Sequence, residues 1–100
     1  MTPTLAERQV TILNGKGLHM RPATRFVKLA SSFQSEVQVI GNGTTANGKS
    51  ILDMTILAAE CGSTLEISVQ GPDAEEAATS LAELVARRFD MMDDGDNEAV

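Results

Sequence analysis

The sequence of 100 residues has no tryptophan, no tyrosine, a single cysteine and a single histidine, and these shortages exclude several classes of protein. The lone Cys61 cannot form an internal disulfide or assemble a cysteine metal cluster, so we expect it to be a small core or helix-end residue. No apolar run approaches the roughly 20 residues of a membrane-spanning helix. The opening residues also lack the basic, apolar pattern of a signal peptide. We therefore expect a cytoplasmic protein with no membrane insertion.

Aromatic side chains are scarce, because three phenylalanines are the whole supply. With 42% hydrophobic residues, the chain predicts one compact domain with a small, mostly aliphatic core. We place this domain at residues 1–89. Residues 90–100 hold five acidic residues, no basic residue and almost no apolar periodicity, which is typical of a disordered acidic tail.

Charge is divided unevenly along the chain. Residues 1–50 carry six basic and two acidic residues, a net charge of +4, whereas residues 51–89 carry two basic and seven acidic residues, a net charge of −5. A basic N-terminal half suits phosphate and acidic protein partners. The overall net charge of −6 and the shortage of aromatic side chains argue against a nucleic-acid partner.

The single histidine stands in the string Gly17-Leu18-His19-Met20-Arg21-Pro22, just before an expected helix. A helix start presents backbone N–H groups without intrahelical partners and the positive end of the macrodipole, so a phosphoryl group on His19 would meet donors already aimed at it. Arg21 can add a charge-assisted contact. Pro22 fits the first helical turn, and the two glycines of the preceding loop permit a tight turn. The string predicts a histidine phosphocarrier.

Two other classes compete with this interpretation. A lone histidine near a helix start is more often a surface or capping residue, and a small ligand-sensing or interaction domain could share the same alternation of strands and helices. A metal or hydrolytic enzyme has little support, because the sequence offers no second histidine, no cysteine cluster and no Ser/His/Asp spacing. We expect neither a metal nor a cofactor.

The string extended to Ala23, Gly-Leu-His-x-Arg-Pro-Ala, resembles the active-site signature of the HPr family. These proteins are the histidine-containing phosphocarriers of the bacterial phosphoenolpyruvate-dependent phosphotransferase system. The resemblance continues in order through Phe26-Val27-Lys28, Asn42-Gly43 and Lys49-Ser50-Ile51-Leu52, and it covers roughly residues 7 to 89.

The resemblance implies a function and its partners. His19 would accept a phosphoryl group from phosphorylated enzyme I on Nδ1 and pass it to an EIIA-type domain of a sugar or regulatory phosphotransferase system. Arg21 would act as an electrostatic partner of the phosphate, not as a base. Met20 stands where the family often has Ala or Thr. We expect the protein to act as a monomer and as a stoichiometric carrier, not as a stand-alone catalyst.

Four strands are expected from short apolar or alternating segments. The clearest is at residues 65–70, where Leu65, Ile67 and Val69 alternate with polar residues. Asn42-Gly43 predicts a hairpin turn between strands at residues 36–40 and 44–48. The first strand is expected at residues 10–13.

Two of three expected helices lie in the first 62 residues. The first follows His19 and has one apolar side, formed by Ala23, Phe26, Val27 and Ala30. Ser50 is expected to cap the second, with Asp53 at capping-box spacing and Gly62 as the stop.

The third helix is expected to open at Gly71-Pro72-Asp73, with Asp73 and Glu76 at capping spacing. One of its sides is traced by Ala77, Leu81, Leu84, Val85 and Arg88. The element order is then βαββαβα. Because each element has one apolar side to bury, we expect an α+β open-faced sandwich, a four-stranded, mostly antiparallel sheet with three helices on one face. The HPr resemblance implies the same fold.

A partner surface is expected beside His19. Apolar Ile51 and Leu52 start the second helix, and we expect at least one of them to be exposed, since Met54, Leu57 and Ala58 fit the inward side better. Further residues expected to bind partners are Met20, Arg25, Lys28, Lys49 and Thr55. For Lys49, a solvated loop charge is a nearly equal alternative.

Ser50 fits two roles, a helix cap and the regulatory phosphorylation site found in some members of the family, where an HPr kinase/phosphorylase would be a further partner. Lys49-Ser50-Ile51 favours the regulatory role. Asp53 opposes it, because it replaces a small residue common in the kinase-regulated branch and puts a carboxylate near the incoming phosphate.

Overall fold

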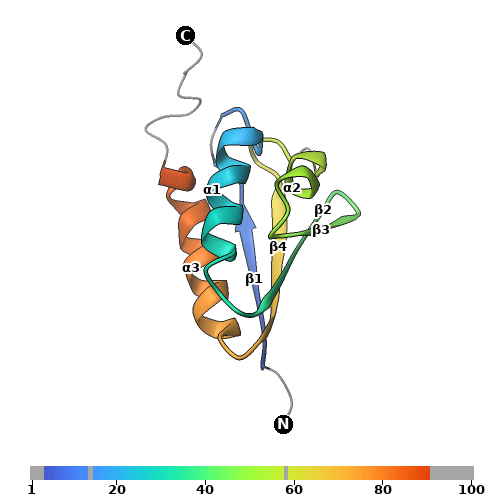
Figure 1. Cartoon of the computed structure of the whole chain (residues 1–100). Coiled ribbons are helices and arrows are strands. Elements are labelled where there is room, and N and C mark those ends of the chain that lie inside the picture. Colours follow the sequence, from blue (N-terminus) through green and yellow to red (C-terminus); the bar gives the residue numbers. More distant parts are fainter. Residues whose placement is uncertain (1–3, 14, 58, 91–100) are drawn as a thin grey trace.

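The computed structural model describes residues 4–13, 15–57 and 59–90. Eight elements follow one another along the chain, and Figure 1 shows them in the colours of the sequence. Their bounds are β1 Thr4–Thr11, α1 Met20–Ala30, β2 Glu36–Gly41, β3 Thr44–Asn47, α2 Ile51–Ile56, β4 Thr64–Gly71, α3 Ala74–Ala86 and the 3-10 turn η1 Arg88–Asp90.

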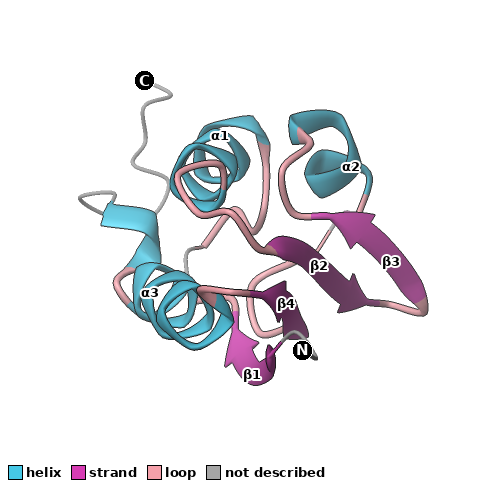
Figure 2. Cartoon of the chain, turned by 60° about the horizontal axis from the view of Figure 1, so that its bottom comes forward, coloured by secondary structure: helices cyan, strands magenta, loops and turns pink. Residues whose placement is uncertain are grey.

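The four strands form one sheet in the order β1-β4-β2-β3, and each neighbouring pair is antiparallel. Figure 2 shows the three helices on one face of this sheet. The α+β open-faced sandwich expected from the sequence is therefore confirmed, with the order βαββαβα. No helix among the described residues is long and apolar enough to cross a membrane.

The core lies between the sheet and the helices. Leu65, Ile67 and Val69 point inward from β4, as their alternation predicted, and they belong to one buried cluster with Phe26 of α1 and Leu81 of α3. Full burial of each such side chain stabilises the fold by about 1.5–3 kcal/mol. This cluster fixes α1 and α3 on the sheet.

Strand β1 is the clearest error in the expected elements. It runs over Thr4–Thr11 instead of residues 10–13, and it pairs with β4 along its whole length, from Thr4 opposite Gly71 to Thr11 opposite Thr64. The apolar alternation that marks a strand is missing because Arg8 takes an inward position. Its guanidinium reaches Glu75 of α3 at 3.0 Å and Thr79 at 3.2 Å.

The hairpin and the caps agree with the sequence only in part. Asn42 and Gly43 both have positive φ, 53° and 73°, as a tight β2–β3 turn requires. At α2, the Ser50 hydroxyl accepts a bond from the Asp53 N–H at 3.1 Å, which confirms the cap. The reciprocal bond of a capping box is absent. The Asp53 carboxylate instead accepts from the Asn47 N–H at 3.1 Å and ties α2 to the end of β3.

Two expectations between α2 and β4 are wrong. The helix ends at Ile56, so Gly62 does not stop it. Gly62 lies in the turn that enters β4, where its φ of 92° and the bond from its N–H to the Ile12 carbonyl are needed. Cys61 belongs to the same turn and is exposed, not a core or helix-end residue.

Helix α3 also begins differently from its expected cap. Asp73 holds the N-cap position, but its carboxylate turns to the loop after α1, where it accepts bonds from the N–H groups of Gln34 and Ser35 and from the Ser35 hydroxyl. These bonds, led by that of the Ser35 hydroxyl, lower the pKa of Asp73. The side chain thus joins two loops that lie 38 residues apart in the chain.

The chain leaves α3 through a left-handed turn. Arg88, Phe89 and Asp90 have φ values of 56°, 59° and 61°. Phe89, not Arg88, is buried, so the expected inward side of the helix ends at Val85. Asp90, the first residue of the expected tail, is the last residue of η1, and residues 91–100 lie outside the described residues.

Candidate functional site

His19 is positioned by contact between two loops. The N–H of Leu18 donates to the carbonyl of Ala59 at 2.8 Å, and the buried Leu18 side chain joins the core. Gly17 makes this approach possible, because its φ is 74° and a Cβ there would lie 2.5 Å from the Ala59 oxygen. The loop before α1 is therefore held against the loop after α2.

His19 is the N-cap residue of α1, with an extended backbone at φ −106° and ψ −165°. Its carbonyl accepts from the Ala23 N–H at 3.0 Å, so the helix begins directly after it. No side chain caps this end, and the first turn contains no acidic residue. Backbone donors and the positive end of the helix dipole are thus presented beside the imidazole.

The two nitrogens of the His19 ring differ in access. The ring is half-buried, and its Nε2 atom is buried with no hydrogen-bond partner among the described residues. In this conformation Nε2 is therefore shielded from an external group. Nδ1 is the candidate nitrogen for chemistry.

A basic groove of about 880 Å³ opens at His19 along α1. We call its four cations, Lys16, Arg21, Arg25 and Lys28, the basic face. The groove brings together the expected His19, Met20, Arg21, Arg25 and Lys28, and it adds Thr24 and Lys16. The position of Lys16, three residues before His19, was the signal in the sequence that could have placed it at the site.

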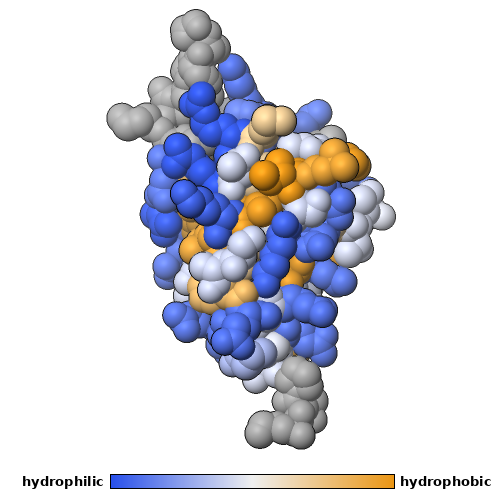
Figure 3. Space-filling view, viewed as in Figure 1, coloured by the Kyte–Doolittle hydropathy of each residue, from blue (hydrophilic) through white to orange (hydrophobic). Residues whose placement is uncertain are grey.

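An apolar patch lies beside the basic face. It consists of Met20, Ile51, Leu52 and Ile56, which are 67%, 39%, 67% and 62% exposed. The exposure predicted for Ile51 or Leu52 is confirmed for both, and Ile56, one turn after Leu52, was missed. Met54 and Leu57 are buried as expected, whereas Ala58 lies outside the described residues. Figure 3 shows hydrophilic side chains over α1 next to apolar ones over α2.

Thr55 and Ser50 lie next to the apolar patch. Both are half-buried, and both hydroxyls bond within α2: that of Thr55 donates to the Leu52 carbonyl at 2.9 Å, and that of Ser50 caps the helix. An added group on Ser50 would lie at the start of the helix that presents Ile51 and Leu52.

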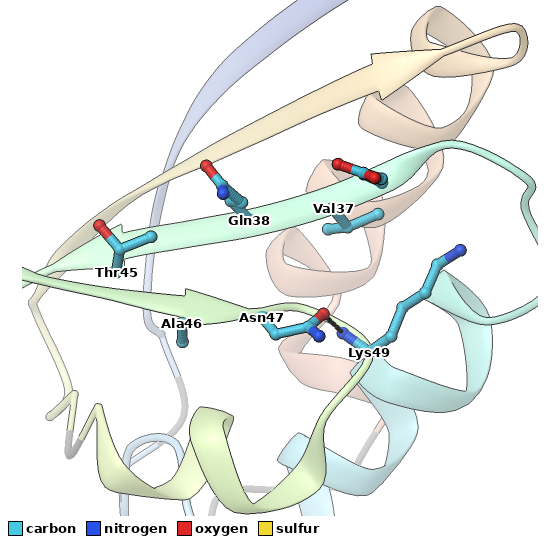
Figure 4. Close-up of a pocket in the computed structure, with 7 residues that line it drawn as sticks. Val37, Gln38, Thr45, Ala46, Asn47 and Lys49 are labelled. Atoms are coloured by element: carbon cyan, nitrogen blue, oxygen red, sulfur yellow. Dashed lines mark hydrogen bonds between the residues drawn. The ribbon is translucent and has the colours of Figure 1, made fainter.

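Lys49 lies apart from the His19 groove. It lines a separate hollow of about 450 Å³ over β2 and β3, where Figure 4 shows it next to Asn47, with its N–H bonded to the Asn47 side-chain oxygen at 2.9 Å. Its ammonium donates to the Phe33 carbonyl at 2.8 Å. Lys49 was expected either to meet a partner or to be a solvated charge. Its ammonium is instead bonded to the loop after α1.

The described residues contain no group of three or more His, Cys, Asp or Glu side chains placed to hold a metal ion. The groove at His19 instead combines one nucleophilic nitrogen, a helix N-terminus and four cations. This arrangement suits a dianionic group such as phosphoryl.

Comparisons with known proteins all point to the same family of relatives. A family model described as "PTS HPr component phosphorylation site" matches residues 6–87. The chain is 40% identical over 85 residues to the phosphocarrier protein HPr of Cupriavidus necator, which covers 85% of this chain and 96% of that protein. It is 38% identical over 87 residues to the phosphocarrier protein NPr of Shewanella violacea, which covers 87% of this chain and 96% of the relative.

A solved structure matches the fold. The crystal structure of HPr-C-His from Thermoanaerobacter tengcongensis aligns with a TM-score of 0.81 at 36% identity, over 85% of this chain and 96% of that chain.

The contact at Gly17 gives a testable prediction. Gly17→Ala should destabilise the protein more than Gly43→Ala, by about 1–3 kcal/mol, because the new methyl group collides with backbone atoms of Ala59 and Glu60. Gly43 is a matched control, since its φ of 73° imposes the same left-handed strain of about 1–2 kcal/mol while nothing lies within 4 Å of its Cβ position. Urea unfolding of both variants measures the difference. Equal losses would show that the two loops do not meet closely at Gly17.

Proposed function

The chain belongs to the HPr family, the phosphocarriers of the phosphotransferase system, and we propose that His19 is the residue that carries the phosphoryl group. The proposal depends most on one observation. The only histidine of the chain stands at the uncapped, acid-free N-terminus of α1, with Nε2 buried and four cations along the adjoining groove.

Transfer to His19 is a nucleophilic displacement at phosphorus. The neutral imidazole keeps its proton on Nε2, and the lone pair of Nδ1 attacks the phosphoryl group of phosphorylated enzyme I. The new P–N bond forms as the bond to the enzyme I donor atom breaks, and the electron pair of that bond stays with the donor. The reverse process hands the phosphoryl group to an acceptor in an EIIA-type domain. Both steps balance without an oxidant or a reductant.

The surroundings of His19 favour the phosphorylated state. Backbone N–H groups at the start of α1 and the helix dipole stabilise the phosphate dianion. Arg21 is exposed in the first turn of α1 and supplies a positive charge to the groove at His19. Because its guanidinium stays protonated, Arg21 acts on the charge of the phosphate and not as a base.

The basic face and the apolar patch together form the proposed docking surface for enzyme I and EIIA-type domains. Apolar side chains supply the buried centre of such an interface, and the cations steer acidic partners toward His19. Besides Arg21, it includes the expected Met20, Arg25, Lys28, Ile51 and Leu52 and the adjoining Thr55, with Ile56 and Lys16 added from the structure. Lys49 contributes by fixing the loop that leads into α2. A cytoplasmic location and a monomeric state complete the proposal.

Regulation at Ser50 is the second part of the proposal. A phosphate on Ser50 would lie at the N-terminus of α2, so the fold tolerates it, but it would place negative charge beside the apolar patch. The Asp53 carboxylate, one helical turn after Ser50, is already bonded to the Asn47 N–H. An HPr kinase/phosphorylase would be the enzyme that modifies Ser50.

The role of His19 is tested by its removal. His19→Ala should abolish labelling by 32P from phosphoenolpyruvate and enzyme I, because the nucleophile is lost, while the free energy of unfolding changes by no more than about 1 kcal/mol. Circular dichroism and urea unfolding check the fold of the variant. Label that persists on a folded His19→Ala protein, or wild-type label that is stable to acid, would refute the assignment.

The role of Ser50 is tested by two substitutions that both preserve a helix cap. Ser50→Asp should slow phosphoryl acceptance from enzyme I about fivefold at low ionic strength, with the loss shrinking as salt is added. Ser50→Asn is the matched control, because asparagine caps a helix equally well without a charge, and it should accept at the wild-type rate. Stopped reactions at a low enzyme I concentration measure both rates. Equal rates for the two variants would limit Ser50 to a capping role.

A further inference from the structure

The basic face belongs to a long stretch without negative charge. No aspartate or glutamate occurs between Glu7 and Glu36, an interval that contains all four cations of the basic face. Among the described residues, Lys16, Arg25 and Lys28 have no ion-pair partner. These three cations near His19 are available to an acidic ligand.

The C-terminal end of the described chain lies next to this face. Figure 1 shows η1 beside α1, and the two elements are in contact. A hollow of about 410 Å³ between α1 and the end of α3 is lined by Arg25, Lys28 and Asp90, together with Leu29, Ser32, Leu84 and Arg87. Arg25 and Lys28 also line the His19 groove. The two hollows therefore share these two cations.

Asp90 is held in place at this junction. Its carboxylate accepts bonds from Arg87 at 2.8 and 3.3 Å. The bonds from Arg87 and, to a smaller extent, the charge of Arg25 lower the pKa of Asp90. The residue before it, Phe89, is 1% exposed and packs in the core. The last described residue, Asp90, therefore lies beside two cations of the basic face, Arg25 and Lys28.

The sequence beyond this point is complementary to the basic face. Residues 91–100 contain Asp93, Asp94, Asp96 and Glu98 and no basic residue. Ten residues can span about 33 Å, whereas the whole of α1, with 11 residues, is about 16 Å long. The segment therefore has the charge and the reach to cover the basic face as far as His19.

We propose that residues 91–100 bind the basic face of the same molecule and compete with the phosphodonor for access to His19. The binding follows from charge, connectivity and reach, and its effect on transfer depends on the function proposed above. Any phosphodonor must bring its anionic group to the same cations, so the acidic segment lowers the rate of acceptance. A short tether holds the segment near the face at a high effective concentration, which compensates for the weakness of each exposed ion pair.

Phosphorylation of His19 would reverse this binding. The phosphoryl group brings about two negative charges to the groove and satisfies the same cations. The segment is then displaced, which leaves the phosphorylated protein open to an EIIA-type domain. The competition therefore affects acceptance more than donation.

The test uses two full-length variants with the same change in net charge. The tail variant carries Asp93→Asn, Asp94→Asn, Asp96→Asn and Glu98→Gln. The control carries Glu7→Gln, Glu36→Gln, Glu66→Gln and Glu76→Gln, which remove exposed or half-exposed acids from the open side of the sheet and from the first turn of α3. The comparison separates the position of the charges from their number.

Two measurements are made on each variant. Amide NMR spectra at about 20 and 300 mM salt should show shifts at residues 15–28 that depend on salt in the wild type and the control but not in the tail variant. At low salt and a low concentration of phosphorylated enzyme I, the tail variant should accept phosphate about threefold faster than the control, and the rates should converge at high salt.

Three results would overturn the inference: no change at residues 15–28, equal acceptance rates in the tail variant and the control, or shifts that grow with protein concentration and so report binding between two copies. A failure of the proposed function looks different. In that case no variant is labelled, while the NMR shifts still decide whether the segment binds.

Discussion

The position of His19 depends on one backbone hydrogen bond between two loops, from the Leu18 N–H to the Ala59 carbonyl at 2.8 Å. A residue with a side chain at position 17 would prevent it, because a Cβ there meets the Ala59 oxygen. The bond joins the start of α1 to the loop that follows α2. The cations of α1 and the exposed apolar side chains of α2 are therefore held on two elements that are joined beside the imidazole.

The features that could be predicted from the sequence are local. The string from Gly17 to Pro22 identified a helix that begins directly after the histidine, because the loop glycines and the first-turn proline act over a few residues. The alternation of Leu65, Ile67 and Val69 gave β4, and Asn42-Gly43 gave the hairpin, since each pattern is decided by its own backbone. The exposure of Ile51 and Leu52 followed from the helical spacing of their buried neighbours.

The features that could not be predicted depend on partners far along the chain. Strand β1 exists because β4 pairs with it, and Arg8 reaches Glu75 of α3 across 67 residues. Asp73 and Lys49 looked like a helix cap and a surface charge, yet both bond to the loop after α1. The burial of Nε2 in His19 was likewise invisible, because it depends on how the ring lies in the folded chain.

One nitrogen of a single histidine is proposed to carry the phosphoryl group. The most direct measurement is NMR of protein labelled with 15N-histidine, before and after phosphorylation by enzyme I and phosphoenolpyruvate. Transfer to Nδ1 predicts a one-bond 31P–15N coupling at Nδ1 of His19, with Nε2 unmodified. Coupling at Nε2, or full incorporation of phosphate with no coupling to either ring nitrogen, would refute this assignment.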